Sequence, residues 1–311
     1  MRIAVVGAGA VGGVFGARLA TAGHEVTFLA RGTTLEVLRT QGLQLESVHG
    51  NVHLSPTHAT DDPAAIGVVD CVLVGVKATQ VAAIAPSLRP LLGQHTAVIP
   101  LQNGVEASVQ LAQALGPDHV LEGLCRVIAE QAGPGKIRHM AVTPLLEFGP
   151  RAGHPPAPAV AAALPAIADA INAAGMQALI PADMAVALWE KFLFIEPIGV
   201  VCAATGESFG PVRTIAETRA LVDAALDEVI AVGQAVGVAW PADAKAVVWQ
   251  RYDSLPPHER TSMARDLLAQ RPSEFDAQTG AVVRLGQQYS VATPVHAVLH
   301  AVLLPRVIPA T

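Results

Sequence analysis

The first 31 residues constrain the fold of this chain more than any other stretch. Residues 2–6 are a short run of apolar and β-branched residues, and Gly7, Gly9 and Gly12 follow in G-x-G-x-x-G spacing. An Ala-rich helical segment comes next, and residues 25–30 have the composition of a second strand. A strand, a glycine turn, a helix and a second strand in this order predict the opening half of a dinucleotide-binding βαβ unit.

Each glycine of the turn has a physical reason. Gly7 permits the tight turn, Gly9 lets the backbone approach a pyrophosphate, and Gly12 lets the helix pack closely on the strand. The helix that follows offers N–H groups and the positive end of its dipole to the phosphates. The same glycines interrupt the apolar run that a secretory signal peptide would need.

The residue at the end of the second predicted strand indicates which dinucleotide binds. An NAD site usually has an acidic residue there for the ribose 2′-hydroxyl, whereas this chain has Arg31. A fixed guanidinium suits a 2′-phosphate, so the sequence favours NADP. The alternative is a solvated arginine at a strand end.

Composition excludes several other classes of protein. The length of 311 residues suggests two domains, and the net charge of −6 argues against a nucleic-acid surface. No run reaches the roughly 18 apolar residues of a membrane span. The 3 cysteines are far apart and the 11 histidines form no metal-binding pattern, so we expect no disulfides, no metal site and a cytoplasmic location.

Further strands of the predicted sheet end in polar side chains. Lys77 and, three residues later, Gln80 follow the apolar run 70–76, and Asn103 follows the run 96–101. Ligands bind beyond the carboxyl ends of strands in an open α/β sheet, so these residues are candidates for the dinucleotide site. The alternatives are a surface lysine at a helix start and a plain Asn-Gly turn.

The pattern changes from mixed to helical near residue 181. Before it, residues 120–129 and 136–148 predict an antiparallel extension of the sheet, followed by a helix over 158–174 and a strand over 177–180. We therefore predict an NADP-binding α/β domain with a doubly wound parallel sheet over residues 1–181, and an all-α domain over residues 182–311. The helices expected in the second domain are 183–204, 212–236, 242–252, 263–270, 275–288 and 294–302.

Three residues of the helical domain could carry chemistry. Lys191 lies on an apolar helix face, where an ammonium must either reach water or serve a purpose. Ser262 and Glu274 each stand at the start of a predicted helix. A snorkelling lysine, a helix cap and a first-turn acid are the plain structural alternatives for these three.

Taken together, these motifs resemble the ketopantoate reductase (2-dehydropantoate 2-reductase) family over nearly the whole chain. The ordered set is GAGAVG, the Arg31 strand end, GVKATQV, LQNGV, the W-x-K that ends at Lys191, and SM…SEFD. The resemblance implies a Rossmann domain, an all-helical domain, a cleft between them, and NADPH-dependent reduction of ketopantoate to pantoate in pantothenate biosynthesis.

The resemblance also implies roles for individual residues. Lys191 would be the catalytic lysine, Ser262 a substrate contact, and Glu274 a cleft acid near cofactor and substrate. Asn103 would meet the cofactor and is a substrate-contact candidate as well. The implied cofactor contacts are Gly7, Ala8, Gly9, Ala10, Val11, Gly12, Arg31, Lys77, Gln80, Asn103, Ala129 and Glu274.

The expected chemistry suits these residue types. Hydride addition turns a ketone oxygen into a developing alkoxide, which needs a cationic proton donor such as Lys191. Desolvation alone would lower the pKa of a lysine, and a nearby carboxylate such as Glu274 would oppose that effect.

The chain departs from the family where the family holds its substrate. Ile195 and Gly199 stand where family members that act on ketopantoate carry asparagine, and His296 replaces the asparagine of the family's T-P-x-N motif. We expect a small-molecule 2-oxo acid as substrate, first of all ketopantoate. The alternatives are a less polar oxo compound, with Ile195 and Gly199 opening an apolar pocket, and a non-catalytic NADP-binding sensor. A homodimer is the candidate oligomeric state.

Overall fold

The computed structural model describes residues 1–307, and the chain divides into two compact units. The first unit comprises Met1–Gln102 and Ala107–Met184, and the second comprises Asn103–Glu106 together with the chain from Ala185 onward. The grouping of Asn103–Glu106 with the helical unit has no counterpart in the sequence pattern. Across residues 1–307, no helix combines the length and apolar character needed to cross a membrane.

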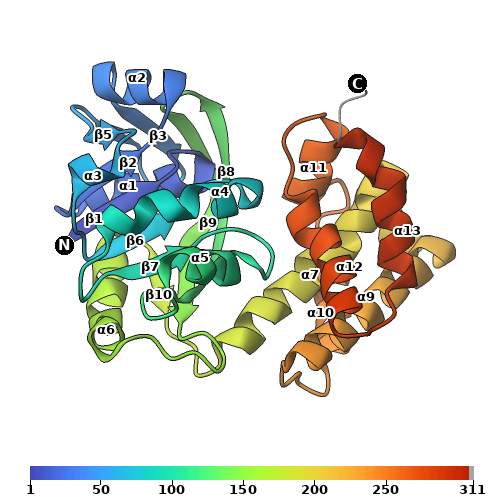
Figure 1. Ribbon diagram of the computed structural model, residues 1–311. Coiled ribbons are helices and arrows are strands. Elements are labelled where there is room, and N and C mark those ends of the chain that lie inside the picture. The colour runs from blue at the N-terminus through green and yellow to red at the C-terminus, as the bar shows by residue number, and fades with distance from the viewer. Residues whose placement is uncertain (308–311) are drawn as a thin grey trace. The chain divides into compact units, whose positions relative to one another are not determined.

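A parallel five-stranded sheet forms the centre of the first unit (Figure 1). Its order is β5-β2-β1-β6-β7, and every neighbouring pair is parallel. Strands added on both sides of β1 make a doubly wound sheet whose switch point lies between β1 and β6. The predicted fold class is therefore confirmed. The strands are β1 (Arg2–Val6), β2 (Glu25–Leu29), β5 (Ala59–Thr60), β6 (Cys71–Val74) and β7 (Ala97–Pro100).

Alternation along the strands places two apolar cores on opposite faces of this sheet. Ile3 and Val5 pack with α1 and α6, whereas Ala4 and Val6 pack with the helices between β5 and β8. Both faces are covered, which explains why the strands are continuously apolar. The helices of this unit are α1 (Ala10–Thr21), α2 (Gly32–Thr40), α3 (Pro63–Ile66), α4 (Ala78–Ile84), the 3-10 helix η1 (Ala85–Leu91), α5 (Ala107–Leu115) and α6 (Pro158–Ala173).

A second, mixed sheet completes the first unit, with the order β10-β9-β3-β4 and β8 beside β9. The hairpin of β8 and β9 is antiparallel, as predicted, while β3 and β10 run parallel to β9. A parallel bridge between Val98 and Val120 links it to the first sheet. The strands are β3 (Leu43–Ser47), β4 (Val52–Leu54), β8 (Glu122–Gly133), β9 (Lys136–Gly149) and β10 (Gln177–Leu179).

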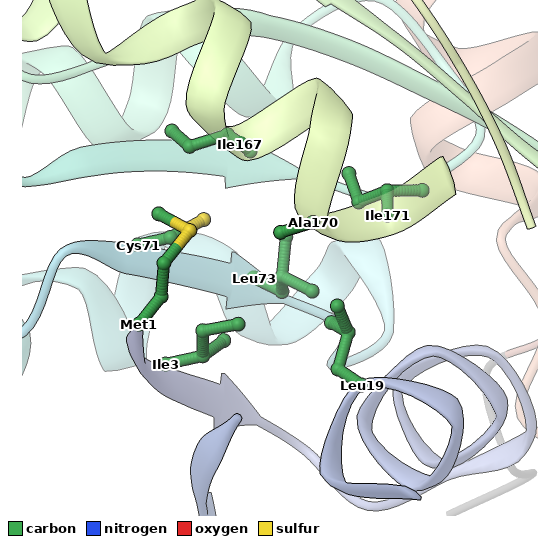
Figure 2. A pocket seen from close by; sticks show the side chains of 8 residues that line it. All are labelled: Met1, Ile3, Leu19, Cys71, Leu73, Ile167, Ala170 and Ile171. Carbon is green, nitrogen blue, oxygen red and sulfur yellow. The ribbon is translucent and has the colours of Figure 1, made fainter. Parts of the chain in front are cut away.

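A small apolar cavity of about 10 Å³ lies in the first unit, and Figure 2 shows the side chains that line it. Met1, Ile3 and Cys71 line it from the starts of β1 and β6, so it lies at the end of the sheet opposite the glycine turn. Its other lining residues are Leu19, Leu73, Ile167, Ala170 and Ile171. An apolar cavity of this size stays dry. It therefore belongs to the packing of the core and is not a dinucleotide site.

The second unit is helical (yellow to red in Figure 1). Two of its predicted helices were wrong in detail: the segment 212–236 is broken at Ile215, whose ψ of 127° is extended, and the segment 275–288 begins with a π-helical turn. The elements are α7 (Met184–Thr205), α8 (Phe209–Thr214), α9 (Ala216–Val236), α10 (Ala244–Ser254), α11 (Ser262–Leu268), the π-helix η2 (Asp276–Gly280), α12 (Ala281–Gln288), α13 (Pro294–Leu303) and the 3-10 helix η3 (Leu304–Arg306).

Helix α7, which carries Lys191, contains a proline in its interior. Pro197 has no N–H, so the carbonyl of Leu193 one turn earlier loses its helical partner. The hydroxyl of Tyr252, fully buried on α10, donates to that carbonyl at 3.1 Å. A side chain of another helix thus replaces the missing hydrogen bond at Leu193, two residues after Lys191.

Candidate functional site

The glycine turn lies where three strand ends meet. The N–H of Gly7 donates to the carbonyl of Leu29 at the end of β2, with an N···O distance of 2.9 Å. A Cβ added to Gly7, whose φ is +96°, would lie 2.9 Å from Val76 beyond the end of β6. The ends of β1, β2 and β6 therefore converge at the switch point of the sheet, where ligands of such folds bind.

The turn is tight in one place and open in another, as a pyrophosphate site requires. A Cβ on Gly12 would lie 2.1 Å from the carbonyl oxygen of Gly7, so only glycine fits there. A Cβ on Gly9 would find its nearest neighbour, the side-chain oxygen of Gln131, at 4.0 Å. Gly9 is the N-cap of α1, without a side-chain cap, and Ala10 and Val11 begin the helix. The open space over a helix N-terminus fits a phosphate.

The other predicted cofactor contacts of the first unit lie just after strands β2 and β6 or on β8. Arg31, exposed, is the N-cap of α2, two residues after β2 ends. Lys77, also exposed, is the N-cap of α4, and the side-chain oxygen of Gln80 accepts a hydrogen bond from its N–H at 3.3 Å. The structure thus brings Lys77 and Gln80 together. Ala129, half-buried, lies on β8 opposite His139 of β9.

Sequence reasoning missed two residues at this edge of the sheet. The buried amide of Gln102 donates to the carbonyls of Val74 and Val76, both at 2.8 Å, and so ties the end of β7 to the end of β6. A Cβ on Gly75 would lie 3.0 Å from the Cα of Gly12. Both residues could have been predicted from the sequence, because each directly follows an apolar run of the kind that forms a buried strand.

In the second unit, Asn103 contacts Glu274. The amide nitrogen of Asn103 donates to a carboxylate oxygen of Glu274 at 3.0 Å, across 171 positions of sequence. The chain also bends at Asn103 and Gly104, where Gly104 has a φ of +106°. The turn interpretation and the site interpretation of Asn103 are therefore compatible.

The neighbours of Asn103 fix its segment to the π-helical region. A Cβ on Gly104 would lie 2.5 Å from the carbonyl oxygen of Ala277. The guanidinium of Arg284 donates to both carboxylate oxygens of Glu106, at 3.3 and 2.7 Å, and also to Asp276 at 2.8 Å. The hydrogen bond to Glu106 raises the pKa of Arg284 above its usual value. Such two-point charge pairing gives geometric precision as well as attraction.

The remaining candidates lie on α7 and α11. Lys191 is half-buried on α7, with Ile195, also half-buried, one turn further on. Ser262 is the exposed first residue of α11, and the side chain that caps this helix belongs to Thr261, which accepts from the N–H of Ala264 at 3.3 Å. The cap interpretation of Ser262 was therefore wrong by one residue.

The alternative in which Ile195 and Gly199 open an apolar pocket was wrong for Gly199. Gly199 does not open a space on α7, because a Cβ there would lie 2.8 Å from the hydroxyl of Thr261 and 3.2 Å from the methyl of Met263. A longer side chain at this position requires Thr261 to move. The side chains of α11 fill the volume that the glycine leaves.

Comparisons with known proteins cover both units. The family model "Ketopantoate reductase PanE/ApbA" matches residues 3–153, and its C-terminal counterpart matches residues 183–306. The uncharacterized oxidoreductase YkpB of Bacillus subtilis is 28% identical over 97% of this chain and 97% of its own length. A 2-dehydropantoate 2-reductase of Mycobacterium tuberculosis is 30% identical, covering 96% of this chain and 95% of its own.

A solved structure agrees with the sequence relatives. The PanE/ApbA family ketopantoate reductase of Ralstonia eutropha JMP134 superposes with a TM-score of 0.86 and 30% identity, over 98% of each chain. With family models on both units and such relatives along nearly its full length, this chain belongs to the ketopantoate reductase family of NADP-dependent oxidoreductases.

Proposed function

We propose that this protein uses NADPH to reduce a 2-oxo acid to the corresponding 2-hydroxy acid, with Lys191 as general acid and ketopantoate as the first candidate substrate. Family membership makes the chain an oxidoreductase rather than a non-catalytic NADP-binding protein. The observation that most supports the proposal is the hydrogen bond between Asn103 and Glu274, at 3.0 Å. The two residues of this hydrogen bond lie in segments that are far apart in the sequence, and each residue is a candidate for the site on its own grounds.

In the proposed reaction, bound NADPH supplies the hydride to the carbonyl carbon. The ammonium of Lys191 stabilises the negative charge that develops on the carbonyl oxygen and then transfers a proton to it. One hydride and one proton convert the ketone to an alcohol, and the neutral lysine regains its proton from water. Glu274 orients the amide of Asn103, whose side-chain oxygen then accepts from the ribose, the carboxamide or the substrate.

The cofactor contacts proposed for the first unit follow from its geometry. Gly9 leaves room for the pyrophosphate, and Arg31 provides the charge for the 2′-phosphate. Lys77 and Gln80 are joined at the N-terminus of α4, which follows the strand next to the glycine turn. We also assign Ala129 and Ser262 to the cofactor and the substrate, respectively.

Replacement of Lys191 tests the proposed acid. Lys191→Ala should lower kcat about 10²- to 10⁴-fold, the usual worth of a positioned proton donor, and leave the Kd for NADPH nearly unchanged. Turnover is measured by NADPH oxidation and binding by quenching of cofactor fluorescence. Lys245→Ala is the matched control, because Lys245 lies in the same unit and its ammonium donates to the surface carboxylates of Asp223 and Asp227, each at 2.7 Å. Near-normal turnover of Lys191→Ala would remove the assignment.

A less polar 2-oxo acid is the second candidate substrate, and Ile195 favours it. This side chain lies one turn after Lys191 and offers no hydrogen bond to a substrate hydroxyl. A hydroxyl left without a partner in a site costs affinity. Steady-state rates with ketopantoate and with 2-oxo acids that have unsubstituted aliphatic or aromatic side chains separate the two. A higher kcat/KM for the apolar acids supports the second candidate, and a higher value for ketopantoate supports the first.

A further inference from the structure

One peptide group at the carboxyl edge of the parallel sheet is held from both sides by glutamine side chains. This group joins Val76 to Lys77, directly before α4 begins. Its carbonyl accepts a hydrogen bond from the side-chain amide of Gln102 at 2.8 Å, and its N–H donates to the side-chain oxygen of Gln80 at 3.3 Å. All four residues belong to the first unit. Because a peptide group is planar, hydrogen bonds at its C=O and at its N–H together fix its orientation.

Gln102 connects this peptide to the end of the sheet. The residue is only 4% exposed, and its amide nitrogen donates a second hydrogen bond to the carbonyl of Val74, the last residue of β6, at 2.8 Å. The backbone supports the same connection, because the N–H of Leu101 also donates to the carbonyl of Val74, at 2.9 Å. Gln102 therefore holds the loop after β6 in a fixed position relative to the ends of β6 and β7.

The loop that Gln102 holds, residues 75–77, lies against the glycine turn. The N–H of Gly75 donates to the carbonyl of Val6, at the end of β1, with an N···O distance of 2.8 Å. A Cβ added to Gly7 would lie 2.9 Å from the backbone nitrogen of Val76. The loop backbone is thus in contact with the turn proposed to bind the pyrophosphate, and the lysine at its end follows directly from that contact.

The oxygen of the Gln102 amide indicates that stability alone does not explain this residue. Both acceptors of the amide nitrogen are carbonyl groups, so the nitrogen must face them and the oxygen must point elsewhere. That oxygen is buried and has no hydrogen-bond partner among residues 1–307. A buried acceptor without a partner destabilises a fold, and such exceptions are expected at functional sites.

We propose that Gln102 is a positioning residue for cofactor binding, which together with Gln80 fixes the peptide before Lys77 and so presents the Lys77 ammonium to NADPH. This inference rests on the proposed function, because it takes Lys77 as a cofactor contact. NADPH carries several negative charges, and a lysine whose backbone is already ordered loses less conformational entropy when it binds them. The effect of Gln102 reaches the cofactor only through the backbone of Lys77.

The variant Gln102→Met tests the proposal by binding. Methionine has a similar length but lacks both the donors and the unpartnered oxygen. If the backbone of one residue must then be ordered on binding, the Kd for NADPH, measured by isothermal titration, should rise about 5- to 30-fold. Thr96→Val is the matched control, because the buried hydroxyl of Thr96 donates to the carbonyl of Val69 at 2.5 Å. It ties β7 to β6 at their opposite ends, so its loss should leave the Kd unchanged even where Tm falls.

A second substitution, Lys77→Met, separates positioning of the lysine from general loosening of the sheet. If Gln102 acts through Lys77, Gln102→Met should weaken binding in the wild-type background and add little in the Lys77→Met background. Equal losses in both backgrounds would overturn the proposal, as would an unchanged Kd in Gln102→Met. An unchanged Kd in Lys77→Met would overturn it as well and would remove Lys77 from the cofactor site.

Hydrogen exchange of the wild-type protein gives a test that does not require Gln102→Met to fold. The proposal requires the amide of Lys77, an exposed residue, to exchange at least tenfold more slowly than in an unstructured chain, as resolved by NMR. Exchange at the unprotected rate would overturn the proposal. Neither the Kd nor the exchange rate depends on turnover, so failure of this inference is distinguishable from failure of Lys191→Ala to lose activity.

Discussion

Arg31 is the side chain on which the choice of cofactor depends most directly. We predict that Arg31→Asp raises the KM for NADPH tenfold or more and shifts the ratio of kcat/KM values toward NADH, because it replaces a cation with the acid typical of NAD sites. Steady-state kinetics with both cofactors measures the shift. Arg39→Gln is the control, since Arg39 is exposed on the same helix and its guanidinium bonds to the backbone of Ala59. An unchanged ratio in Arg31→Asp would mean that another residue recognises the 2′-phosphate.

A substitution at Gly9 should change the affinity for NADPH without changing the stability of the fold. The φ of −78° at Gly9 suits alanine, and a Cβ there meets nothing closer than 4.0 Å. We therefore predict that Gly9→Ala changes Tm by no more than Gly133→Ala, whose added Cβ likewise meets nothing within 4 Å. The Kd for NADPH should rise at least tenfold in Gly9→Ala only, because the methyl group occupies the approach to the pyrophosphate. Isothermal titration and thermal unfolding measure the two effects. Equal affinities of both variants would contradict the proposed binding mode.

Individual residues also show which parts of the candidate site can be predicted from the sequence. The glycine spacing and the strand ends predicted Gly7, Arg31 and Lys77 at one edge of the sheet, because that inference needs only local pattern and sheet topology. The contact of Asn103 with Glu274 could be anticipated only through the family resemblance. The sequence did not predict the contact of His296 with Glu196 and Glu228. These residues are far apart in the chain, and a charged residue whose partner is distant in sequence cannot be distinguished there from an ordinary surface residue.

The sequence predicted which helices and strands form better than it predicted where they are interrupted. The apolar runs predicted β1, β6 and β7, since strands covered on both faces have no polar positions. The two-residue strand β5 was missed because so short a segment carries no periodicity. The break at Ile215 lacks a glycine or proline of its own, and the π-helical turn of η2 differs from an α-helix by a hydrogen-bond shift that apolar periodicity does not record.

The middle of α7 depends on a hydrogen bond from another helix. Tyr252→Phe leaves the carbonyl of Leu193 buried without its partner and should cost about 1–3 kcal/mol of unfolding free energy, measured with urea. Tyr289→Phe, at a side chain that is 42% exposed, is the control and should change little. In a Pro197→Ala background the helix regains its own donor, so the cost of Tyr252→Phe should shrink. Equal costs in both backgrounds would show that the hydroxyl does not replace the missing N–H.

The buried His296 makes the stability of the folded chain depend on pH, because its Nε2 lies 2.7 Å from Glu196 and its Nδ1 lies 2.6 Å from Glu228. Although burial lowers it, the two glutamates raise the pKa of His296 from its usual 6.5 to about 9 in the folded chain, so the unfolded chain releases this proton first as the pH rises. The contribution is fully present below pH 6.5 and is lost as the pH approaches 9, which corresponds to a fall of up to about 3 kcal/mol in unfolding free energy.

Urea unfolding between about pH 6.5 and 8.5, under reducing conditions, measures this fall. The upper limit separates His296 from the buried thiols of Cys71 and Cys202, whose pKa burial raises from 9.0 to about 12 and which therefore destabilise the fold only at higher pH. The triple variant Glu196→Gln, Glu228→Gln, His296→Asn removes the ring together with the two carboxylates that could take up its proton, and its stability should vary less with pH over this window than that of the wild type. Parallel curves for the two proteins would mean that the folded chain does not hold, at His296 and its two glutamates, a proton that the unfolded chain releases.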